Sequence, residues 1–156
     1  MIGKYQKLLK HQDIKTRTQA EKSIWSIWFR SGNSQHEKIL VSGARLIESR
    51  TLDQAEVVLT KLIDLSPDFA EAYNQRAIVH FLKGNWAQAI SDCQQTINLN
   101  PSHFGAYAGI GHCYWELGHL SSAHSAYSKA LELNPNLHAV AQAITQIENE
   151  LENENA

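Results

Sequence analysis

The spacing of the prolines constrains this chain more than any other feature. Pro67, Pro101 and Pro135 are its only three prolines, and each lies 34 residues after the one before. Residues 70–101 read AEAYNQRAIVHFLKGNWAQAISDCQQTINLNP, and residues 104–135 read FGAYAGIGHCYWELGHLSSAHSAYSKALELNP. A fixed period of this size indicates a repeat array, in which each unit buries its apolar face only against its neighbours.

Each period is predicted to hold two antiparallel helices joined by a short turn. In the last period the first helix covers about 104–117, and Gly118 ends it before the second begins at about Leu120. The proline after Asn134 disfavours the α conformation at that asparagine, so the second helix ends there. Gly84 occupies the place of Gly118 one period earlier, and both suit a left-handed turn residue.

The matching positions resemble the tetratricopeptide repeat (TPR) family, whose motif is W-x2-L-G-x2-Y, then A-x3-F, then P. The third repeat is the best match, with Tyr107, Ile110, Gly111, Tyr114, Ala123, Tyr127, Ala130 and Pro135. The second has Tyr73, Arg76, Ala77, His80, Ala89, Cys93, Thr96 and Pro101, and the first has Ile39, Ser42, Gly43, Leu46, Ala55, Leu59, Leu62 and Pro67. The resemblance covers about residues 36–151 and implies an all-α superhelix, the TPR solenoid.

The small residues of the motif are expected where two helices approach closely. They are Gly43, Ala77 and Gly111 on the first helices, and Ala55, Ala89 and Ala123 on the second. A larger side chain at such a position overpacks the contact at a cost of roughly 1–3 kcal/mol.

The expected organisation has five parts. They are a basic N-terminal segment with a degenerate half-repeat helix (1–35), three TPR units (36–69, 70–103 and 104–137), and a C-terminal capping helix with its tail (138–156). The capping helix is predicted over about 137–152, because Val140, Ile144, Ile147 and Leu151 form one apolar stripe on it.

The N-terminal segment is predicted to hold a short helix over about Tyr5–His11 and a longer one over about 18–30. Thr18 and Glu21 have the spacing of a capping box at the start of the longer helix. Counting back by one period places Trp25 and Trp28 on second-helix positions. We therefore expect both tryptophans to be buried against the next helix, over Ile39–Ile47; the alternative is an exposed aromatic anchor for a partner.

Charge is distributed unevenly along the chain. Residues 1–50 contain ten Lys/Arg and four Asp/Glu, whereas residues 51–156 contain four and twelve. A basic N-terminal third is compatible with docking to nucleic acid or an anionic membrane. The alternatives are a solvated capping face or charge complementarity between the ends of neighbouring molecules.

Targeting signals are weak in this sequence. No apolar run approaches the roughly 20 residues that span a bilayer, and the N-terminus lacks the apolar region of a secretory signal. It is basic and poor in acidic residues, as in a transit peptide, but also poor in serine. We therefore expect a cytoplasmic protein.

Catalytic and cofactor functions find little support in the sequence. The metal and nucleotide motifs H-E-x-x-H, C-x-x-C and G-x-x-x-x-G-K are absent, so no metal and no cofactor is predicted. Adjacent helical residues such as His112 and Cys113 point apart, which disfavours a nucleophile pair. Cys93 and Cys113 are interpreted as buried thiols, with a regulatory disulfide as the alternative.

The resemblance implies that the first helix of each repeat lines a concave groove that binds a peptide or a partner helix. The matching positions are Glu37, Leu40, Ala44, Ile47, Glu71, Asn74, Ile78, Phe81, Gly105, Ala108, His112 and Trp115. Phe81 and Trp115 are the expected anchors, since aromatic residues dominate binding hot spots, and Asn74 suits paired contacts with a peptide backbone. Alternatively, the C-terminal helix or the N-terminal segment fills the groove, or Phe81 packs against Trp115.

One TPR subset grips the terminal carboxylate of heat-shock chaperones with Lys, Asn and Arg. The matching positions here are Leu40, Ala44, Gln75, Gly105 and Gly109, of which none is basic and none is Asn. The groove positions contain no basic residue either, which disfavours nucleic acid. The sequence therefore predicts a non-catalytic protein–protein interaction module of another kind. The alternatives are a self-assembling structural protein and a basic-arm docking module.

Overall fold

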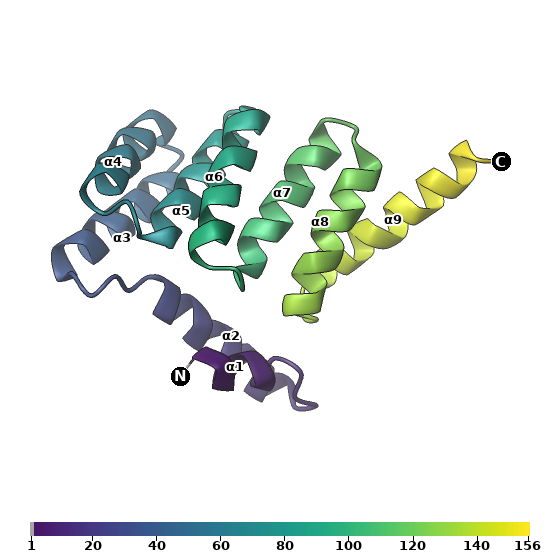
Figure 1. Ribbon diagram of the computed structural model, residues 1–156, viewed down its shortest axis with the longest axis horizontal. Helices are drawn as coiled ribbons and strands as arrows, with labels where there is room; N and C mark the ends of the chain where they lie inside the picture. Colours follow the sequence, from purple (N-terminus) through teal and green to yellow (C-terminus); the bar gives the residue numbers. More distant parts are fainter. Residues whose placement is uncertain (1) are drawn as a thin grey trace.

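The structure, a computed structural model, describes residues 2–156 and folds them into nine α-helices without a strand. Figure 1 shows their order. The helices are α1 (Ile2–Leu8), α2 (Ile14–Trp28), α3 (Ser34–Glu48), α4 (Leu52–Leu65), α5 (Ala70–Leu82), α6 (Trp86–Leu99), α7 (Phe104–Glu116), α8 (Leu120–Leu133) and α9 (His138–Glu154). The all-α fold class predicted from the sequence is confirmed.

Helices α3 to α8 form three antiparallel pairs that stack side by side, and α9 follows the last pair (Figure 1). The second helix of each pair ends two residues before a proline. Ser66, Asn100 and Asn134, which precede the prolines, have φ angles of −142°, −139° and −138°. All three residues lie outside the α region, which the ring of the following proline disfavours. The prolines therefore set the period of the array.

The two glycines of the motif lie where paired helices touch. A Cβ atom added at Gly43 would lie 2.7 Å from a methyl carbon of Leu59, and one added at Gly111 would overlap the ring of Tyr127. Non-bonded carbon atoms do not approach so closely, so only glycine fits at these two positions. The close approach predicted for these positions is confirmed.

A left-handed residue closes the turn inside each repeat. Gly84 and Gly118 have φ angles of 76° and 74°, as their spacing predicted. In the first repeat the same position is occupied by Arg50, whose φ is 60°. A side chain with a Cβ atom loses roughly 1–2 kcal/mol in this conformation.

Replacing Arg50 with glycine is therefore expected to stabilise the protein. After the greater freedom of glycine in the unfolded chain is subtracted, the gain is about 0.5–1 kcal/mol, or roughly 1–4 °C in Tm. Thermal unfolding followed by circular dichroism measures it. Arg45→Gly, at an exposed position of α3, is the matched control and should lose about 1 kcal/mol. Equal losses in both variants would contradict the strain assigned to Arg50.

The longer N-terminal helix begins four residues earlier than predicted. The side chain of Asp13 accepts a hydrogen bond from the backbone N–H of Thr16 (2.9 Å) and caps α2. The capping-box prediction at Thr18 is thus wrong. Asp13 is an equally good N-cap residue, and no residue in the first turn of α2 is buried, so no periodic pattern of apolar residues marks it as helical. Thr18 instead donates its hydroxyl to the carbonyl oxygen of Ile14.

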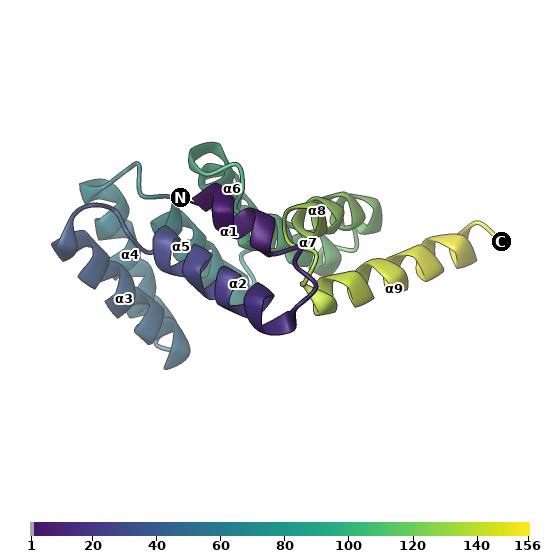
Figure 2. The same cartoon turned by 90° about the horizontal axis from the view of Figure 1, so that it is seen from below.

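Helices α1 and α2 form an antiparallel hairpin, called here the N-terminal hairpin (residues 2–28). It crosses the edge of the array at which α5, α7 and α9 begin (Figures 1 and 2). Trp28 stacks on His103, with ring centroids 4.0 Å apart, and Trp25 meets Phe104 edge-on at 5.7 Å. The prediction that both tryptophans pack against Ile39–Ile47 is therefore wrong.

The hairpin is held firmly against the repeats. Leu9, Ile24 and Trp28 are buried with Phe104 in one apolar cluster. The side-chain amide of Asn136 donates to the carbonyl oxygen of Leu9 (2.7 Å). The bond from Asn136 joins the hairpin to the end of the last repeat, 127 positions away along the chain.

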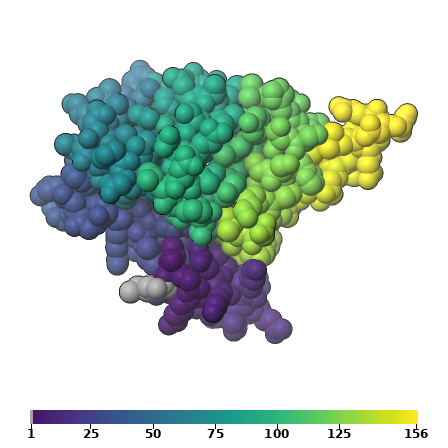
Figure 3. Space-filling view, in the orientation of Figure 1, coloured from purple at the N-terminus to yellow at the C-terminus, as the bar shows by residue number. Residues whose placement is uncertain are grey.

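Helix α9 packs its apolar stripe on the last repeat. Val140 and Ile147 are buried, and Ile144 and Leu151 are partly buried in the same cluster as Tyr127 of α8. The outer end of α9 extends beyond the array (Figure 3). Within residues 2–156, none of the helices combines the length and apolar character needed to cross a membrane.

Candidate functional site

An apolar pocket of about 250 Å³ opens between α5 and α7. It is lined by Asn74, Ala77, Ile78 and Phe81 of α5, Ala89 and Cys93 of α6, Gly105, Gly109, His112 and Cys113 of α7, and Trp25 of the N-terminal hairpin. No Lys, Arg, Asp or Glu is among these lining residues. The pocket therefore suits an apolar group better than an ion.

Two glycines of α7 create the space. A Cβ atom at Gly105 would lie 2.8 Å from Cη2 of Trp25, and one at Gly109 would lie 3.0 Å from the sulfur of Cys93. Both contacts are shorter than ordinary van der Waals separation, so any side chain at these positions would disturb the pocket. The hollow thus depends on glycine at Gly105 and Gly109.

Aromatic rings line the other end of the pocket. Phe81 meets Trp86 edge-on with centroids 5.2 Å apart, and lies 6.0 Å from the ring of His112. Nδ1 of His112 lies 2.7 Å from the hydroxyl oxygen of Tyr127, within hydrogen-bonding distance. Ile78 keeps 37% of its surface exposed. The rings are held in place while an aliphatic side chain remains accessible.

The positions predicted to line a groove fall into three groups. The pocket collects Asn74, Ile78, Phe81, Gly105 and His112. The helix contacts bury Leu40, Ile47, Glu71 and Ala108, which is a correction to the prediction that they face a partner. The remaining three lie outside the pocket. Ala44 is half-buried on α3, and Trp115 packs against the apolar cluster of α8 and α9. The carboxylate of Glu37 accepts hydrogen bonds from the backbone N–H groups of Ser31 and Gly32.

Glu71 is fully buried because it has three hydrogen-bond donors. One carboxylate oxygen accepts from the side-chain amides of Asn74 (2.9 Å) and Gln75 (2.8 Å). The other lies 2.7 Å from Nε2 of His103. Nδ1 of His103 accepts the backbone N–H of Ala106, so the ring carries its proton on Nε2 and donates it to Glu71.

This network changes the role of two predicted residues. Asn74 is 4% exposed and gives one of its two amide N–H groups to Glu71, so only its second N–H and its carbonyl oxygen remain for other contacts. Glu71 and His103 are 0% exposed and lie beneath Trp28, which stacks on the imidazole. Together they fix the N-terminal hairpin to the start of α7, beside the pocket.

Trp25 lines the pocket but was not among the predicted groove positions; the sequence offered it only as an alternative, as an exposed aromatic anchor. It precedes the repeats, and counting back one period placed its helix against Ile39–Ile47. The signal that could have found it is the pair Gly105 and Gly109, since two glycines one turn apart on a predicted helix leave room for a large side chain from elsewhere.

The two cysteines that line the pocket are buried free thiols. Burial raises the pKa of the Cys93 thiol above its ordinary range and that of Cys113 to about 11. Burial also raises the pKa of the Tyr127 hydroxyl to about 12. Within residues 2–156, no three His, Cys, Asp or Glu side chains gather as metal ligands.

These shifts predict that alkaline pH destabilises the protein. In the unfolded chain a cysteine thiol ionises with a pKa of about 8.5. Below that pH the thiol is neutral in both states and stability is unchanged; as the pH rises from there toward the higher pKa of the folded state, ionisation favours the unfolded chain. The free energy of unfolding should therefore fall between about pH 8.5 and 11. Urea titrations across this range measure the fall, and Cys93→Ala/Cys113→Ala should reduce it. A flat profile would contradict the burial of these thiols.

The sequence of this chain matches proteins built from the same repeat. The family model described as tetratricopeptide repeat matches residues 68–136. A TPR repeat-containing protein of Rhizobium etli is 30% identical over 108 residues, which are 69% of this chain and 53% of that protein. The SGT1 homolog of Homo sapiens is 32% identical over 91 residues, 57% of this chain and 25% of that protein. The chain thus spans about half or less of these relatives.

Solved structures agree with this result. The first TPR of Spaghetti (RPAP3), bound to the HSP90 peptide SRMEEVD, is 28% identical with a TM-score of 0.72. The match covers 76% of this chain and 95% of that chain. The first TPR domain of human RPAP3 is 30% identical with a TM-score of 0.63, and covers 71% and 93%. With its proline period, its paired helices and these matches, the chain belongs to the tetratricopeptide repeat family.

Proposed function

We propose that this chain is a non-catalytic protein-interaction module that binds a peptide or helix of another protein in the groove between α5 and α7. The proposal rests on the apolar pocket lined by Trp25, Ile78, Phe81 and His112. It is supported by the similarity to the RPAP3 domain, which was solved with a bound peptide. A groove that binds a peptide uses a few buried apolar contacts for most of the affinity.

The pocket determines which part of a ligand is bound most tightly. Its volume of about 250 Å³ has room for one bulky apolar side chain, and its lining contains no charged residue. A leucine, methionine or phenylalanine side chain would lose contact with water there and gain roughly 1.5–3 kcal/mol. The ligand we propose therefore presents a large apolar residue to this pocket.

The proposed ligand differs from the acidic chaperone peptide of the RPAP3 structure. Of the positions that match the carboxylate grip, Leu40 is buried and the amide of Gln75 is bonded to Glu71. Gly105 and Gly109 have no side chain and form the pocket floor. A terminal carboxylate would thus find no cation at these positions, which supports an apolar anchor in place of an ionic one.

Peptide display on the purified protein tests this proposal. Twelve-residue random peptides are selected on the wild type, and the enriched sequences are expected to share one bulky apolar residue. Fluorescence anisotropy then compares wild type with Phe81→Glu, which puts a charge at the pocket. The affinity should fall by at least about 30-fold, since a hot-spot residue contributes 2 kcal/mol or more.

Val57→Glu is the matched control. Val57 of α4 is 55% exposed and does not line the pocket, so the same change of charge there should leave binding intact. Circular dichroism must show that both variants are folded. Peptides that bind Phe81→Glu as tightly as wild type would place the ligand elsewhere and contradict the proposal.

A further inference from the structure

Basic side chains gather on the N-terminal hairpin. Lys4, Lys7, Lys10, Lys15, Arg17 and Lys22 lie on α1, on α2 and on the turn between them, and we call this group the basic tip. Residues 1–32 carry five more Lys/Arg than Asp/Glu, whereas residues 33–156 carry seven fewer. The molecule therefore has one positive end on an otherwise acidic body.

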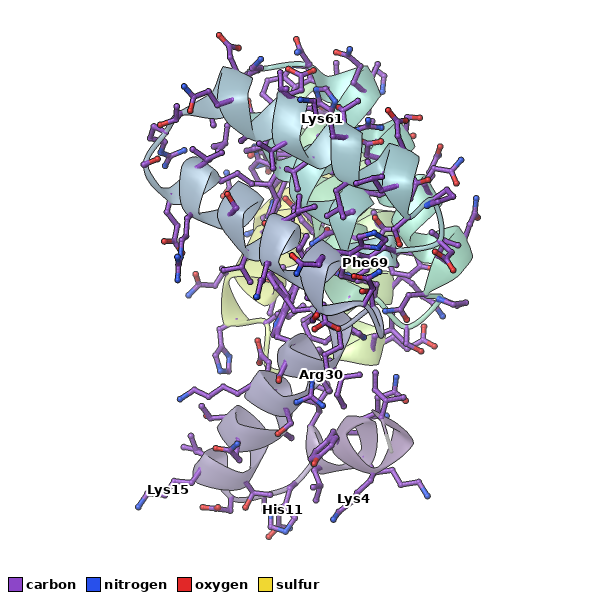
Figure 4. The ribbon with its side chains drawn as sticks, turned by 90° about the vertical axis from the view of Figure 1, so that its left-hand side faces the viewer. Lys4, His11, Lys15, Arg30, Lys61 and Phe69 are labelled. Atoms are coloured by element: carbon purple, nitrogen blue, oxygen red, sulfur yellow. The ribbon has the colours of Figure 1, made fainter. Side chains whose placement is uncertain are left out.

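The charges of the basic tip are not neutralised by neighbouring carboxylates. Across residues 2–156, the recorded ion pairs include none of its lysines. Asp13 uses its carboxylate to cap α2, and Glu21 accepts a hydrogen bond from Asn134. Figure 4 shows Lys4, His11 and Lys15 along the outer edge of the hairpin, with Lys61 at the opposite end of the molecule.

An exposed apolar side chain lies within this group. Ile14, the first residue of α2, keeps 67% of its surface in contact with water, the largest fraction of any large hydrophobic residue in the part of the chain described. It is followed by Lys15, and Lys10 lies four residues before it in the turn between α1 and α2. Cations around an exposed aliphatic side chain match the headgroup layer of a bilayer, which is anionic outside and apolar beneath.

The basic tip is also rigid. The inner faces of α1 and α2 are fixed by the buried cluster of Leu9, Ile24, Trp28 and Phe104 and by the bond from Asn136 to Leu9. The lysines thus project from a folded surface, and their positions do not depend on ordering a flexible arm. The ordering entropy that a disordered basic segment loses on binding is avoided here.

We propose that the basic tip docks the protein on an anionic membrane surface, with Ile14 inserted at the level of the headgroups. The acidic body is repelled by the same surface, so the field orients the tip toward the bilayer. Nucleic acid is the less favoured partner, because it rewards cations but offers no apolar layer to Ile14. The proposal does not depend on what the pocket binds.

Vesicle co-sedimentation at low salt tests this surface. The probes are vesicles of phosphatidylcholine alone and of phosphatidylcholine with 30% phosphatidylglycerol. We expect binding only to the anionic vesicles, weakened by 0.5 M NaCl. A lysine near such a surface contributes about fivefold in binding, so Lys4→Gln/Lys10→Gln/Lys15→Gln should weaken it by roughly 100-fold.

Two further variants distinguish the sources of binding. Ile14→Ser is expected to weaken vesicle binding several-fold and to leave binding to a 20-base-pair DNA duplex unchanged. Lys38→Gln/Arg45→Gln/Lys61→Gln removes three charges elsewhere and should bind vesicles like wild type. The proposal is overturned if the protein fails to bind anionic vesicles, if it binds only DNA, or if both triple variants lose vesicle binding equally. Sedimentation without lipid would also overturn it, because it would indicate assembly of this chain with itself.

Discussion

Replacing His103 by leucine is expected to lower the free energy of unfolding by about 3 kcal/mol, because it removes one of the hydrogen-bond donors of the buried Glu71 carboxylate. Glu71 would keep only the amides of Asn74 and Gln75 as donors while remaining fully buried. The backbone N–H of Ala106 would lose its acceptor, and Trp28 would lose the ring on which it stacks. Urea unfolding at pH 7 measures the loss.

The double variant His103→Leu/Glu71→Leu separates the buried charge from the other losses. Removing both partners leaves no unpaired carboxylate, so the double variant should be less destabilised than the sum of the two single variants, with a coupling of about 1–3 kcal/mol. Strict additivity, or a loss below 1 kcal/mol in His103→Leu, would show that the network does not hold the hairpin in place.

Gly111→Leu is the second change with a large expected effect. The first atom of the new side chain would already overlap the ring of Tyr127, which is buried. We expect a loss of about 3 kcal/mol or more, the upper end for overpacked cores, and a fall in Tm of roughly 6–12 °C. Thermal unfolding by circular dichroism measures it.

Gly3→Leu is the matched control for this variant. A Cβ atom at Gly3 meets nothing within 4 Å, so the same substitution there tests only the change of residue type. It should leave Tm unchanged or raise it slightly, because leucine favours the helix over glycine. If Gly111→Leu unfolds at the wild-type temperature, the assignment of the close contact between α7 and α8 is wrong.

The repeats could be predicted from the sequence because their determinants are local and recur. A proline every 34 residues fixes where each second helix ends, and small residues such as Gly43 and Gly111 mark the helix contacts within each pair. Each of these signals acts within one period, so one repeat supports the interpretation of the next. The apolar stripe of α9 could be recognised for the same reason.

The N-terminal hairpin could not be placed in this way, because its partners are distant in sequence. Trp28 stacks on a residue 75 positions away, and Leu9 is bonded to Asn136. No periodicity in residues 2–28 indicates either contact. Counting back one period assumed that α2 continues the array. Instead, Trp28 of α2 stacks on the buried imidazole of His103 at the start of α7.

The candidate site was predicted in part for a related reason. Ile78, Phe81 and His112 line the pocket, as their motif positions suggested, since the repeat fixes which face of each first helix points inward. Burial was harder to predict. From sequence, a glutamate such as Glu71 is expected to be exposed unless its partners are known. Those partners are two amides within one helical turn and a histidine 32 residues along the chain.

Site-specific photo-crosslinking tests the central claim most directly, which is that a partner binds between α5 and α7. A benzophenone amino acid replaces Ile78 in the pocket or, in the control, Val57 on the outer surface of α4, and each protein is irradiated with the peptide recovered by display. The account predicts a covalent adduct at position 78, suppressed by excess unlabelled peptide, and none at position 57. Adducts at position 57 alone, or equal yields at both positions, would contradict it.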